Sequence, residues 1–292
     1  MTLSSILLLG IAAIAISSCK DPSAPPVAGP TGPTSLQFDD DSATILLDDT
    51  VTVPVIALDA HNNHVPAVAV TYASSNLSVA SVDQTGRIRA LGLGTATITA
   101  HDGGLTDVLA VTVAPQFIEL ATGGRHTCGI TGMHQLYCWG WDDSEQLGAD
   151  TGSADCRQQT GVPCSLVPIR VAGGDRFVSV TLGLAHTCAL TESGIAYCWG
   201  GNYDGAVRIV SSQEQITTPT PVVGGHTFAS LGAGYLHTCG ITTQGDTYCW
   251  GLDNTGQLGS GTASADRCQF GYPDSPCSRS PTKVVGAHAF VQ

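Results

Sequence analysis

The fold of this chain is decided by a segment that occurs three times, and its third copy reads His237-Thr-Cys-Gly-Ile-Thr-Thr-Gln-Gly-Asp-Thr-Tyr-Cys-Trp-Gly251. The same frame, His-Thr-Cys followed by Tyr-Cys-Trp-Gly, starts at His126 and at His186, so the copies follow each other at steps of 60 and 51 residues. Nine residues before each histidine stands a phenylalanine: Phe117, Phe177 and Phe228. A frame repeated at such a spacing is typical of proteins built from stacked structural units. We therefore predict a repeat protein.

Two cysteines in each copy stand ten residues apart with a turn between them. Gly194 and Gly245 fall at the last position of a three-residue turn, where a left-handed backbone is needed, and His134 takes this position in the first copy. In an antiparallel hairpin around such a turn, the two cysteines face each other closely enough for a disulfide. The predicted pairs are Cys128 with Cys138, Cys188 with Cys198, and Cys239 with Cys249.

The first and third copies are longer than the second by 9 and 11 residues, and only these two carry additional cysteines. Each insertion brings its own pair, and an insertion of this kind most simply closes on itself. We therefore expect Cys156 to bridge Cys164 and Cys268 to bridge Cys277. Five local bridges in one chain predict an exported protein in an oxidising environment.

Zinc is the alternative use of these cysteines, because His126, Cys128 and Cys138, like their counterparts, are common zinc ligands. Zinc sites usually contain more closely spaced cysteine pairs, and an export signal favours disulfides. We therefore expect neither a metal nor a cofactor. The histidines and tryptophans of the repeated frame are expected inside the repeats, as hydrogen-bonded polar groups and as packing residues.

The N-terminus has the features of an export signal. An apolar run from Leu7 to Ile16 is too short to span a membrane and is followed by Ser17-Ser18-Cys19. This sequence resembles the bacterial lipobox, which implies that residues 1–18 are a signal peptide and that Cys19 is lipidated. Met1 to Gly10 departs from the usual pattern because it contains no Lys or Arg. The alternative is an ordinary cleaved signal with an incidental cysteine. We expect an exported, membrane-anchored lipoprotein, in the outer membrane or at the cell surface.

A proline-rich spacer, residues 19–34, precedes a region of short alternating apolar runs, residues 35–114. These runs are Thr50–Asp59, Val68–Ser74, Arg87–Ala90, Thr95–Ala100 and Val108–Val113. Short alternating runs between Asn, Asp and Gly turns predict a small β-sandwich. The stretch Tyr72–Ala100 resembles the bacterial immunoglobulin-like group 2 family. We interpret Asp39–Asp41 and Asp48-Asp49 as solvated edge charges, because their spacing does not suit a calcium loop.

The third copy is the fullest and continues as Trp250-Gly-Leu-Asp-Asn-Thr-Gly-Gln-Leu-Gly-Ser-Gly-Thr262. This pattern resembles the regulator of chromosome condensation repeat, which implies that each copy forms one four-stranded blade of a β-propeller. The first copy departs from the pattern because Glu145 replaces the second glycine. The second copy departs further and reads Asn202-Tyr-Asp-Gly-Ala-Val-Arg208, without Gln-Leu-Gly. We expect the loops at these two places to follow different courses.

The copies divide the C-terminal region, 117–292, into three blades and the start of a fourth. They occupy residues 117–176, 177–227 and 228–289, and the fourth begins at Phe290. Propellers contain about four to eight blades, and the resemblance implies seven as the common number. We therefore expect an incomplete array with exposed sheet edges. The predicted fold class is all-β, with a small immunoglobulin-like sandwich followed by a partial, three-blade propeller of four-stranded blades.

Charge and motif content exclude two classes of function. A net charge of −13 repels phosphate backbones, so we expect no nucleic-acid partner. The sequence contains no nucleophile elbow, no metal-binding helix motif and no phosphate loop. The nearest catalytic candidates are the loop acids Asp142, Asp143 and Glu145, which any acidic surface would supply. We therefore expect that the protein is not an enzyme.

The insertions between the repeated strands are the expected recognition surface. Asp142–Pro168, Asn202–Thr218 and Asp253–Pro281 vary in length and sequence on a fixed frame, which is typical of binding loops. Four aromatic residues lie in or beside them and are candidate anchors, with local packing as the alternative role: Trp141, Tyr203, Phe270 and Tyr272. We predict a surface-anchored binding or adhesion module for an extracellular protein or glycan, held to the membrane by its lipid. The alternative is an inhibitor of an extracellular enzyme, since a secreted bacterial relative in the resembling family inhibits β-lactamase. An enzyme is a less favoured reading.

Overall fold

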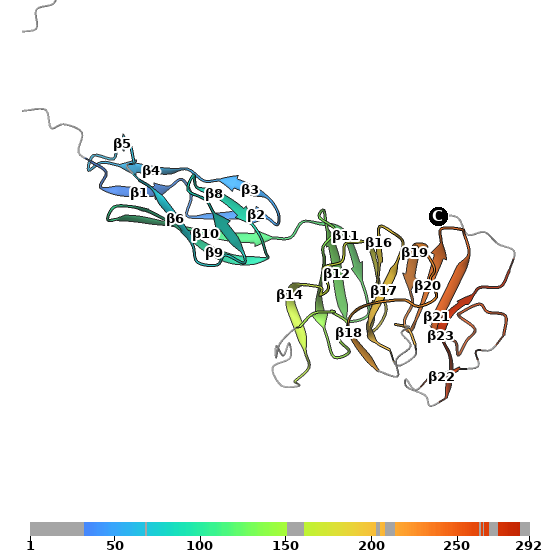
Figure 1. The fold of residues 1–292 in the computed structure, drawn as a ribbon. Coiled ribbons are helices and arrows are strands. Elements are labelled where there is room, and N and C mark those ends of the chain that lie inside the picture. The colour runs from blue at the N-terminus through green and yellow to red at the C-terminus, as the bar shows by residue number, and fades with distance from the viewer. Residues whose placement is uncertain are drawn as a thin grey trace, which may run out of the picture.

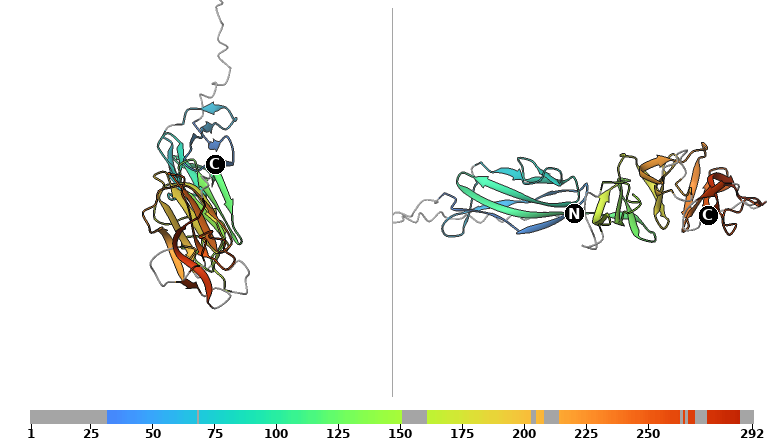
Figure 2. Two further views of the ribbon diagram at one scale, coloured as in Figure 1. Left: turned by 90° about the vertical axis from the view of Figure 1, so that its right-hand side faces the viewer. Right: turned by 90° about the horizontal axis from the view of Figure 1, so that it is seen from below.

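A computed structural model of the chain describes residues 32–67, 69–150, 161–202, 205–207, 214–262, 264, 266–268 and 274–286. Every regular element in these ranges is a β-strand, and Figure 1 shows an N-terminal group of sheets followed by a C-terminal one. Figure 2 shows that the two groups lie end to end. The described ranges contain no helix long and apolar enough to cross a membrane. The predicted signal peptide, Cys19 and the start of the fourth copy at Phe290 lie outside them.

The N-terminal group is a sandwich of short strands. Its strands are β1 (Ser35–Phe38), β2 (Ser42–Leu46), β3 (Thr50–Thr52), β4 (Val55–Leu58), β5 (His64–Val65), β6 (Thr71–Ser74), β7 (Ala80–Val82), β8 (Arg87–Ala90), β9 (Gly94–Asp102) and β10 (Leu105–Ala114). They form three sheets with the orders β1-β4-β5, β2-β10-β9-β6 and β3-β8-β7. The strand β2 runs parallel to β10, whereas β9 and β10 form a long antiparallel pair.

The sandwich core follows from the alternation along its two longest strands. Ala96, Ile98 and Ala100 of β9 are buried, as are Leu109 and Val111 of β10, while their neighbours face outward. One expectation is wrong. The run Thr50–Asp59 was expected as a single strand, but it divides into β3 and β4, which belong to different sheets. Pro54 lies at the break, since proline offers no N–H to a sheet.

The C-terminal group contains one sheet for each copy of the repeat. Its strands are β11 (Phe117–Thr122), β12 (His126–Thr131), β13 (Leu136–Trp141), β14 (Cys164–Arg170), β15 (Phe177–Leu182), β16 (His186–Thr191), β17 (Ala196–Gly201), β18 (Gln215–Pro221), β19 (Phe228–Ala233), β20 (His237–Thr242), β21 (Thr247–Leu252), β22 (Asp266–Cys268) and β23 (Ser275–Lys283). The first two sheets have four antiparallel strands each, in the orders β11-β12-β13-β14 and β15-β16-β17-β18.

The third sheet corrects the prediction of four strands per blade. Its order is β19-β20-β21-β23-β22, so the insertion of the third copy adds a fifth strand at the outer edge. The pairing of β22 with β23 places Cys268 opposite Ser275, and Cys268 is bonded to Cys277. The segment of the insertion that forms β22 is therefore an edge strand of the sheet and not part of a loop.

The central hairpins have the predicted geometry. Cys128 faces Cys138 in the register of β12 and β13, and their Cα atoms are 4.1 Å apart in the disulfide. The pairs Cys188–Cys198 and Cys239–Cys249 repeat this arrangement with Cα distances of 4.1 and 4.0 Å. These distances suit a directly opposed, non-hydrogen-bonded pair, for which about 4.5 Å is usual. The turn residues His134, Gly194 and Gly245 all have a left-handed backbone, with φ of 62°, 79° and 86°.

Four of the five predicted disulfides lie within the described residues. They are Cys128–Cys138, Cys188–Cys198, Cys239–Cys249 and Cys268–Cys277. Cys164 is also disulfide-bonded, and its predicted partner Cys156 lies outside the described residues. Cys128 and Cys138 are thus unable to act as thiolate ligands for zinc.

The three sheets of the repeats stand side by side in Figure 1 and share one core. The first and second sheets each present their disulfide face to the next sheet, which covers it with its phenylalanine and tryptophan. Phe177 and Trp199 of the second sheet are buried in the same cluster as Ile130 of the first sheet. Tyr137 of the first sheet instead belongs to the cluster of the sandwich core and is 5% exposed. The sandwich thus packs against the first repeat.

Candidate functional site

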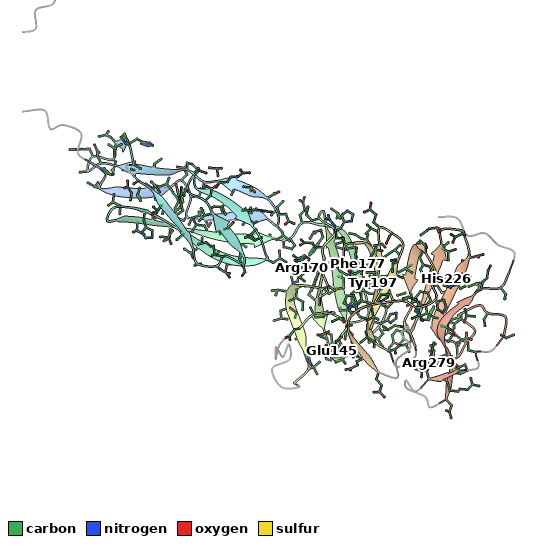
Figure 3. The ribbon with its side chains drawn as sticks, in the orientation of Figure 1. Glu145, Arg170, Phe177, Tyr197, His226 and Arg279 are labelled. Carbon is green, nitrogen blue, oxygen red and sulfur yellow. A yellow bond between two sulfur atoms is a disulfide. The ribbon has the colours of Figure 1, made fainter. Side chains whose placement is uncertain are left out.

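The insertions of the repeats lie at one end of the sheets, which we call the loop rim. It is formed by residues 123–125, 141–150, 183–185, 205–207, 234–236 and 253–262. The amide of Trp141 donates to the carbonyl of Arg125 over 3.0 Å, which joins two parts of the rim within the first repeat. In Figure 3, Glu145 and Arg279 lie at this end, whereas Arg170, Phe177, Tyr197 and His226 lie toward the opposite end.

One turn recurs in all three repeats at the loop rim. It begins at Asp142, Asn202 or Asp253, whose carbonyl accepts a hydrogen bond from the amide three residues later. In the first and third repeats the aspartate side chain also accepts a bond from the amide of Leu147 or Leu258. The apolar residues that follow the turn are fully buried: Leu147, Val207 and Leu258. The turn is therefore a structural device that anchors each insertion to its sheet.

At this turn the first two repeats follow the same course, contrary to expectation, whereas residues 203–204 and 208–213 of the second loop lie outside the described residues. Glu145 has φ of 62°, close to the 72° of Gly205 and the 73° of Gly256, and all three amides bond to the first residue of the turn. A glutamate accepts the left-handed conformation at some cost in strain. Sequence comparison missed the match because the position is glycine in only two of the three repeats.

The loop acids that were considered as catalytic candidates have structural surroundings. Asp142 is buried and caps the turn. Asp143 is partly exposed, and its carboxylate lies 3.4 Å from the guanidinium of Arg125. Its backbone carbonyl accepts a hydrogen bond from the side chain of Gln215 in the second repeat over 3.0 Å. The bond from Gln215 links neighbouring insertions. Within the described ranges, no group of three or more His, Cys, Asp and Glu side chains is placed to hold a metal ion.

Trp141 is the one predicted aromatic anchor that the structure describes. It is half-buried, and the guanidinium of Arg125 lies over its ring at 5.4 Å from the centroid. Tyr203, Phe270 and Tyr272 lie outside the described residues. Trp141 and Arg125 therefore form one surface unit with Asp143, in which the cation is held between a carboxylate and an aromatic face.

Tyr235 is a rim residue that sequence reasoning missed. It is 65% exposed and precedes β20 in the third repeat, and its carbonyl accepts a bond from the amide of Leu184 over 3.0 Å. The sequence did contain a signal. The two residues before the repeated histidine are Gly124-Arg125, Leu184-Ala185 and Tyr235-Leu236, so this pair changes completely while its flanks do not. Variation at a fixed position next to an invariant frame marks an exposed side chain.

The repeated histidines bind the neighbouring repeat. His126 Nε2 lies 2.7 Å from Thr187 Oγ1 of the second sheet, and His186 Nε2 lies 2.9 Å from Thr238 Oγ1 of the third. Thr187 donates its own hydroxyl hydrogen to the carbonyl of Gln146 over 2.8 Å. His126 must therefore donate from Nε2, because the threonine oxygen has no second hydrogen to offer. The first and second copies of the frame thus each depend on the next copy for a hydrogen bond.

The tryptophans of the frame make a second contact between repeats. Trp199 Nε1 donates to the carbonyl of Gln146 in the preceding repeat over 3.0 Å, and Trp250 Nε1 donates to the carbonyl of Ala206 over 2.8 Å. Both indoles are fully buried. Gln146 and Ala206 directly follow the recurring turn of the loop rim. Contacts between sheets therefore fix the position of the insertions as well as the core.

Burial keeps the two innermost histidines neutral. It lowers the pKa of His126 from 6.5 to about 3 and that of His186 to about 4, with a smaller contribution in the same direction from the next histidine along. His126 Nδ1 is buried without a hydrogen-bond partner, so a proton placed there would have no acceptor. Burial also lowers the pKa of His237, which is less enclosed. His126 and His186 are therefore structural groups that hold neighbouring repeats together.

Comparisons with known proteins agree with both parts of the fold. Residues 34–113 match the bacterial Ig-like domain (group 2), and residues 134–190, 177–206 and 228–257 match models of the regulator of chromosome condensation (RCC1) repeat. The chain therefore carries a bacterial Ig-like domain followed by RCC1 repeats. The Ig-like domain and the disulfides place the protein outside the cytoplasm.

Curated relatives match through the repeats. The regulator of chromosome condensation of Mus musculus is 28% identical over 176 residues, which cover 60% of this chain and 39% of that protein. The ultraviolet-B receptor UVR8 of Arabidopsis thaliana is 31% identical over 161 residues, which cover 53% and 34%. The chain thus spans little more than a third of the length of these relatives. The solved structure of Prp20p from Saccharomyces cerevisiae aligns with a TM-score of 0.46 at 19% identity, and covers 71% of this chain and 48% of that one.

Proposed function

We propose that the protein is a surface-anchored binding module that recognises an extracellular protein or glycan through the loop rim. The observation that carries this proposal is the contrast between the recurring turn and what surrounds it. The turn is held by the same backbone bonds in all three repeats, yet the rim positions beside it carry Arg125, Ala185 and Leu236. A rigid frame with changing side chains is suited to recognition, because little conformational entropy is lost on binding.

The rim also offers the kinds of side chains that dominate binding energy. Trp141 with Arg125 forms one candidate contact, and the exposed ring of Tyr235 forms another. Tryptophan, tyrosine and arginine are the residues most often found at the centres of interfaces. A net charge of −13 disfavours a nucleic acid as the ligand. The absence of a catalytic motif in the sequence supports binding rather than enzymatic activity.

In this proposal the Ig-like sandwich is a spacer and Cys19 is the anchor. Acylation of Cys19 would attach the chain to a membrane, since each buried methylene contributes about 0.8 kcal/mol. The Cys19→Ser variant is expected to move from the membrane fraction to the soluble exported fraction, or to remain unprocessed. Normal acylation of that variant, seen by labelling with a fatty-acid analogue, would contradict the anchor.

The recognition surface is tested by binding of the labelled protein to arrays of purified surface glycans and extracellular matrix proteins. The double variant Trp141→Ala/Tyr235→Ala is expected to lose at least about tenfold in affinity for any ligand found, because aromatic anchors often contribute more than 1 kcal/mol each. Met133→Ala/Ile195→Ala is the matched control, since both residues are exposed at the hairpin turns of the opposite end. If the sandwich alone, residues 32–114, binds as tightly as the whole chain, the assignment to the rim is wrong.

A further inference from the structure

The outer face of the sheet β3-β8-β7 carries the positive charge of the sandwich. Residues 35–114 contain nine aspartates, and Arg87 and Arg89 are the only Lys or Arg side chains among them. Both arginines are exposed on β8, the middle strand, whereas Ile88 between them is 1% exposed. Side chains two residues apart on a strand point to the same face. The two arginines therefore share the outer surface, with their Cα atoms about 7 Å apart.

Hydroxyl groups flank one of these arginines. Arg89 lies directly opposite Thr50 of β3 and Ser81 of β7 in the register of the sheet. Directly opposed residues share a face, so the three side chains form a row across the sheet, with the guanidinium group between two hydroxyls. A groove of about 510 Å³ includes this row and is also lined by Arg87, Asp48 and Asp83. We call it the arginine groove.

The donors of the arginine groove are not engaged by other described residues. The ion pairs described in the chain both lie in the repeats, so neither groove arginine is paired with a described carboxylate. Asp83 bonds within its own turn, where its Oδ1 accepts from the hydroxyl and the amide of Thr85 over 2.6 and 2.8 Å. The hydroxyls of Thr50 and Ser81 have no hydrogen-bond partner among the described residues. Two guanidinium groups and two hydroxyls are therefore available to a ligand.

We propose that the arginine groove binds a carboxylate-bearing polysaccharide, such as a polymer of uronic acids. A guanidinium group presents two parallel N–H donors that match the two oxygens of a carboxylate. The hydroxyls of Thr50 and Ser81 suit the hydroxyls of the sugar that carries this carboxylate. An acidic protein fits less well, because protein interfaces have an apolar core and Val82 is the only apolar residue among the described residues that line the groove.

The acids of the groove determine the direction of the polysaccharide. The amide of Asp83 donates to the carbonyl of Arg87, and the amide of Asp48 donates to the carbonyl of Ala90. The two aspartates therefore lie at opposite ends of β8, where each repels a carboxylate. A chain of acidic sugars that crosses the strands along the row of Arg89 avoids both ends, whereas a chain that follows β8 meets both. The polysaccharide of this proposal therefore runs across the sheet.

This site goes beyond the function proposed above, because it lies on the sandwich and not on the loop rim. The sandwich contacts the first repeat at Tyr137, near the hairpin turn, at the end of the repeats opposite the rim. The first repeat thus lies between the arginine groove and the rim. The two sites can be occupied independently, and substitutions in one are expected to leave the other unchanged.

The test is the binding of the full chain to immobilised polygalacturonate, measured by biolayer interferometry in the Cys19→Ser background so that no acyl chain binds the surface. The parent is expected to bind polygalacturonate and not neutral dextran, and more weakly as the ionic strength rises from about 0.01 to 0.15 M. Arg87→Gln/Arg89→Gln should weaken binding about tenfold, because two exposed charge contacts are lost. Arg87→Lys/Arg89→Lys should weaken it about threefold, since the charge stays but the paired donors do not.

A second pair of substitutions tests whether the ligand is a sugar. Poly-glutamate carries carboxylates without sugar hydroxyls and serves as the second probe. Thr50→Val/Ser81→Ala should weaken binding to polygalacturonate about threefold and leave binding to poly-glutamate unchanged, because only hydroxyl contacts are lost. If the parent binds poly-glutamate as tightly as polygalacturonate, the occupant is an acidic protein and the proposal is overturned.

Two control variants locate the binding. Arg267→Gln/Arg279→Gln removes two exposed arginines from the third repeat, with the same change in net charge, and should bind as the parent does. Trp141→Ala/Tyr235→Ala alters only the rim and should also bind as the parent does. A parent that fails to bind polygalacturonate, or an equal loss in either control, would overturn the proposal. Urea unfolding followed by far-UV circular dichroism verifies that the sandwich of each variant is folded.

Discussion

The sandwich and the repeats bury their strands by different means. The sandwich relies on alternating aliphatic residues, such as Ile98, Leu109 and Val111, which are at most 1% exposed, and residues 35–114 contain neither cysteine nor tryptophan. The repeats place a disulfide at the centre of each sheet and join neighbouring sheets by His–Thr and Trp–carbonyl hydrogen bonds. A sandwich therefore closes on its own core, whereas a blade has half of its core in the next blade.

The stabilities of the two regions can be measured separately because all four tryptophans lie in the repeats: Trp139, Trp141, Trp199 and Trp250. Tryptophan fluorescence therefore reports the repeats alone, whereas far-UV circular dichroism reports both regions. Two transitions are expected in denaturant, and only one of them should be visible in the fluorescence. Changes that act on one region should move one transition.

Reduction of the disulfides is expected to have the largest effect. Each hairpin disulfide contributes about 2–4 kcal/mol to stability, and the sum over Cys128–Cys138, Cys188–Cys198 and Cys239–Cys249 is comparable with the total stability of a domain, about 5–15 kcal/mol. Excess dithiothreitol should therefore unfold the repeats and leave the cysteine-free sandwich folded. The measurement is a red shift of the fluorescence with part of the β-sheet dichroism retained. An unchanged tryptophan spectrum in the fully reduced protein would refute it.

Mild acid is expected to have the second-largest effect, because it should destabilise the repeats more than the sandwich. Because the pKa of His126 is lowered to about 3 and that of His186 to about 4, the unfolded chain, with its usual pKa of 6.5, binds more protons below pH 6.5. Their contribution to stability is full above pH 6.5 and is lost as the pH falls toward the folded pKa values. From pH 7 to pH 5 the loss is about 2 kcal/mol for each histidine. Urea unfolding at both pH values should show a lower midpoint by fluorescence.

The sandwich provides the control for the acid experiment. Its histidines His61, His64 and His101 are exposed, whereas His126 and His186 of the repeats are buried. The transition seen only by circular dichroism should move much less between pH 7 and pH 5. Equal shifts of the two transitions would show that the buried histidines are not the cause.

A cavity in the sandwich core should destabilise the sandwich and leave the stability of the repeats unchanged. Ile98 lies on β9 and is fully buried, so Ile98→Ala removes aliphatic volume from the centre of that core. Such substitutions cost about 2–5 kcal/mol. Urea unfolding should show a lower midpoint for the sandwich transition while the fluorescence transition stays in place. Loss of both transitions together would mean that the regions unfold as one unit.

The smallest expected effect is a gain in the repeats. Glu145 has φ of 62° at the position where the other repeats have glycine, so Glu145→Gly removes the strain of a left-handed glutamate. We expect about 1 kcal/mol of stabilisation in the fluorescence transition. Asp143→Gly, two residues earlier, is the matched comparison and should not stabilise the protein. A loss of stability in Glu145→Gly would mean that its side chain makes a needed contact.

Local patterns in the sequence were sufficient for much of the fold. The spacing of Cys188 and Cys198 around Gly194 predicts the hairpin, its turn conformation and its disulfide, because these depend only on residues close in the chain. Alternation predicts β9 and β10 for the same reason. The fifth strand β22 was missed, since three residues of an insertion carry no alternation that distinguishes a strand from a loop.

The candidate site was predicted only in outline. Trp141 was selected as an aromatic residue beside an insertion, but its stacking under Arg125 required the turn of the first repeat and the end of β13 to be placed together. Tyr235 was overlooked because it lies outside the insertions, and its only signal is the varying pair of residues before the repeated histidine. The capping role of Asp142 could not be predicted either, since an aspartate that caps a turn and a catalytic aspartate cannot be distinguished by residue type.

Strand pairing and cross-linking within a hairpin are local, so the repeated, disulfide-closed hairpins behind an Ig-like sandwich could be predicted from the sequence. The contacts that join one repeat to the next could not be predicted in this way and are seen in the folded molecule. His126 and Thr187 are 61 residues apart. Glu119 and Val180, whose amide donates to the Glu119 carboxylate, are also 61 residues apart. Contacts between elements so distant in the chain depend on how whole sheets stack. The repeated frame marks His126 and Thr187 in the sequence, but it does not show which residue of another repeat each of them contacts.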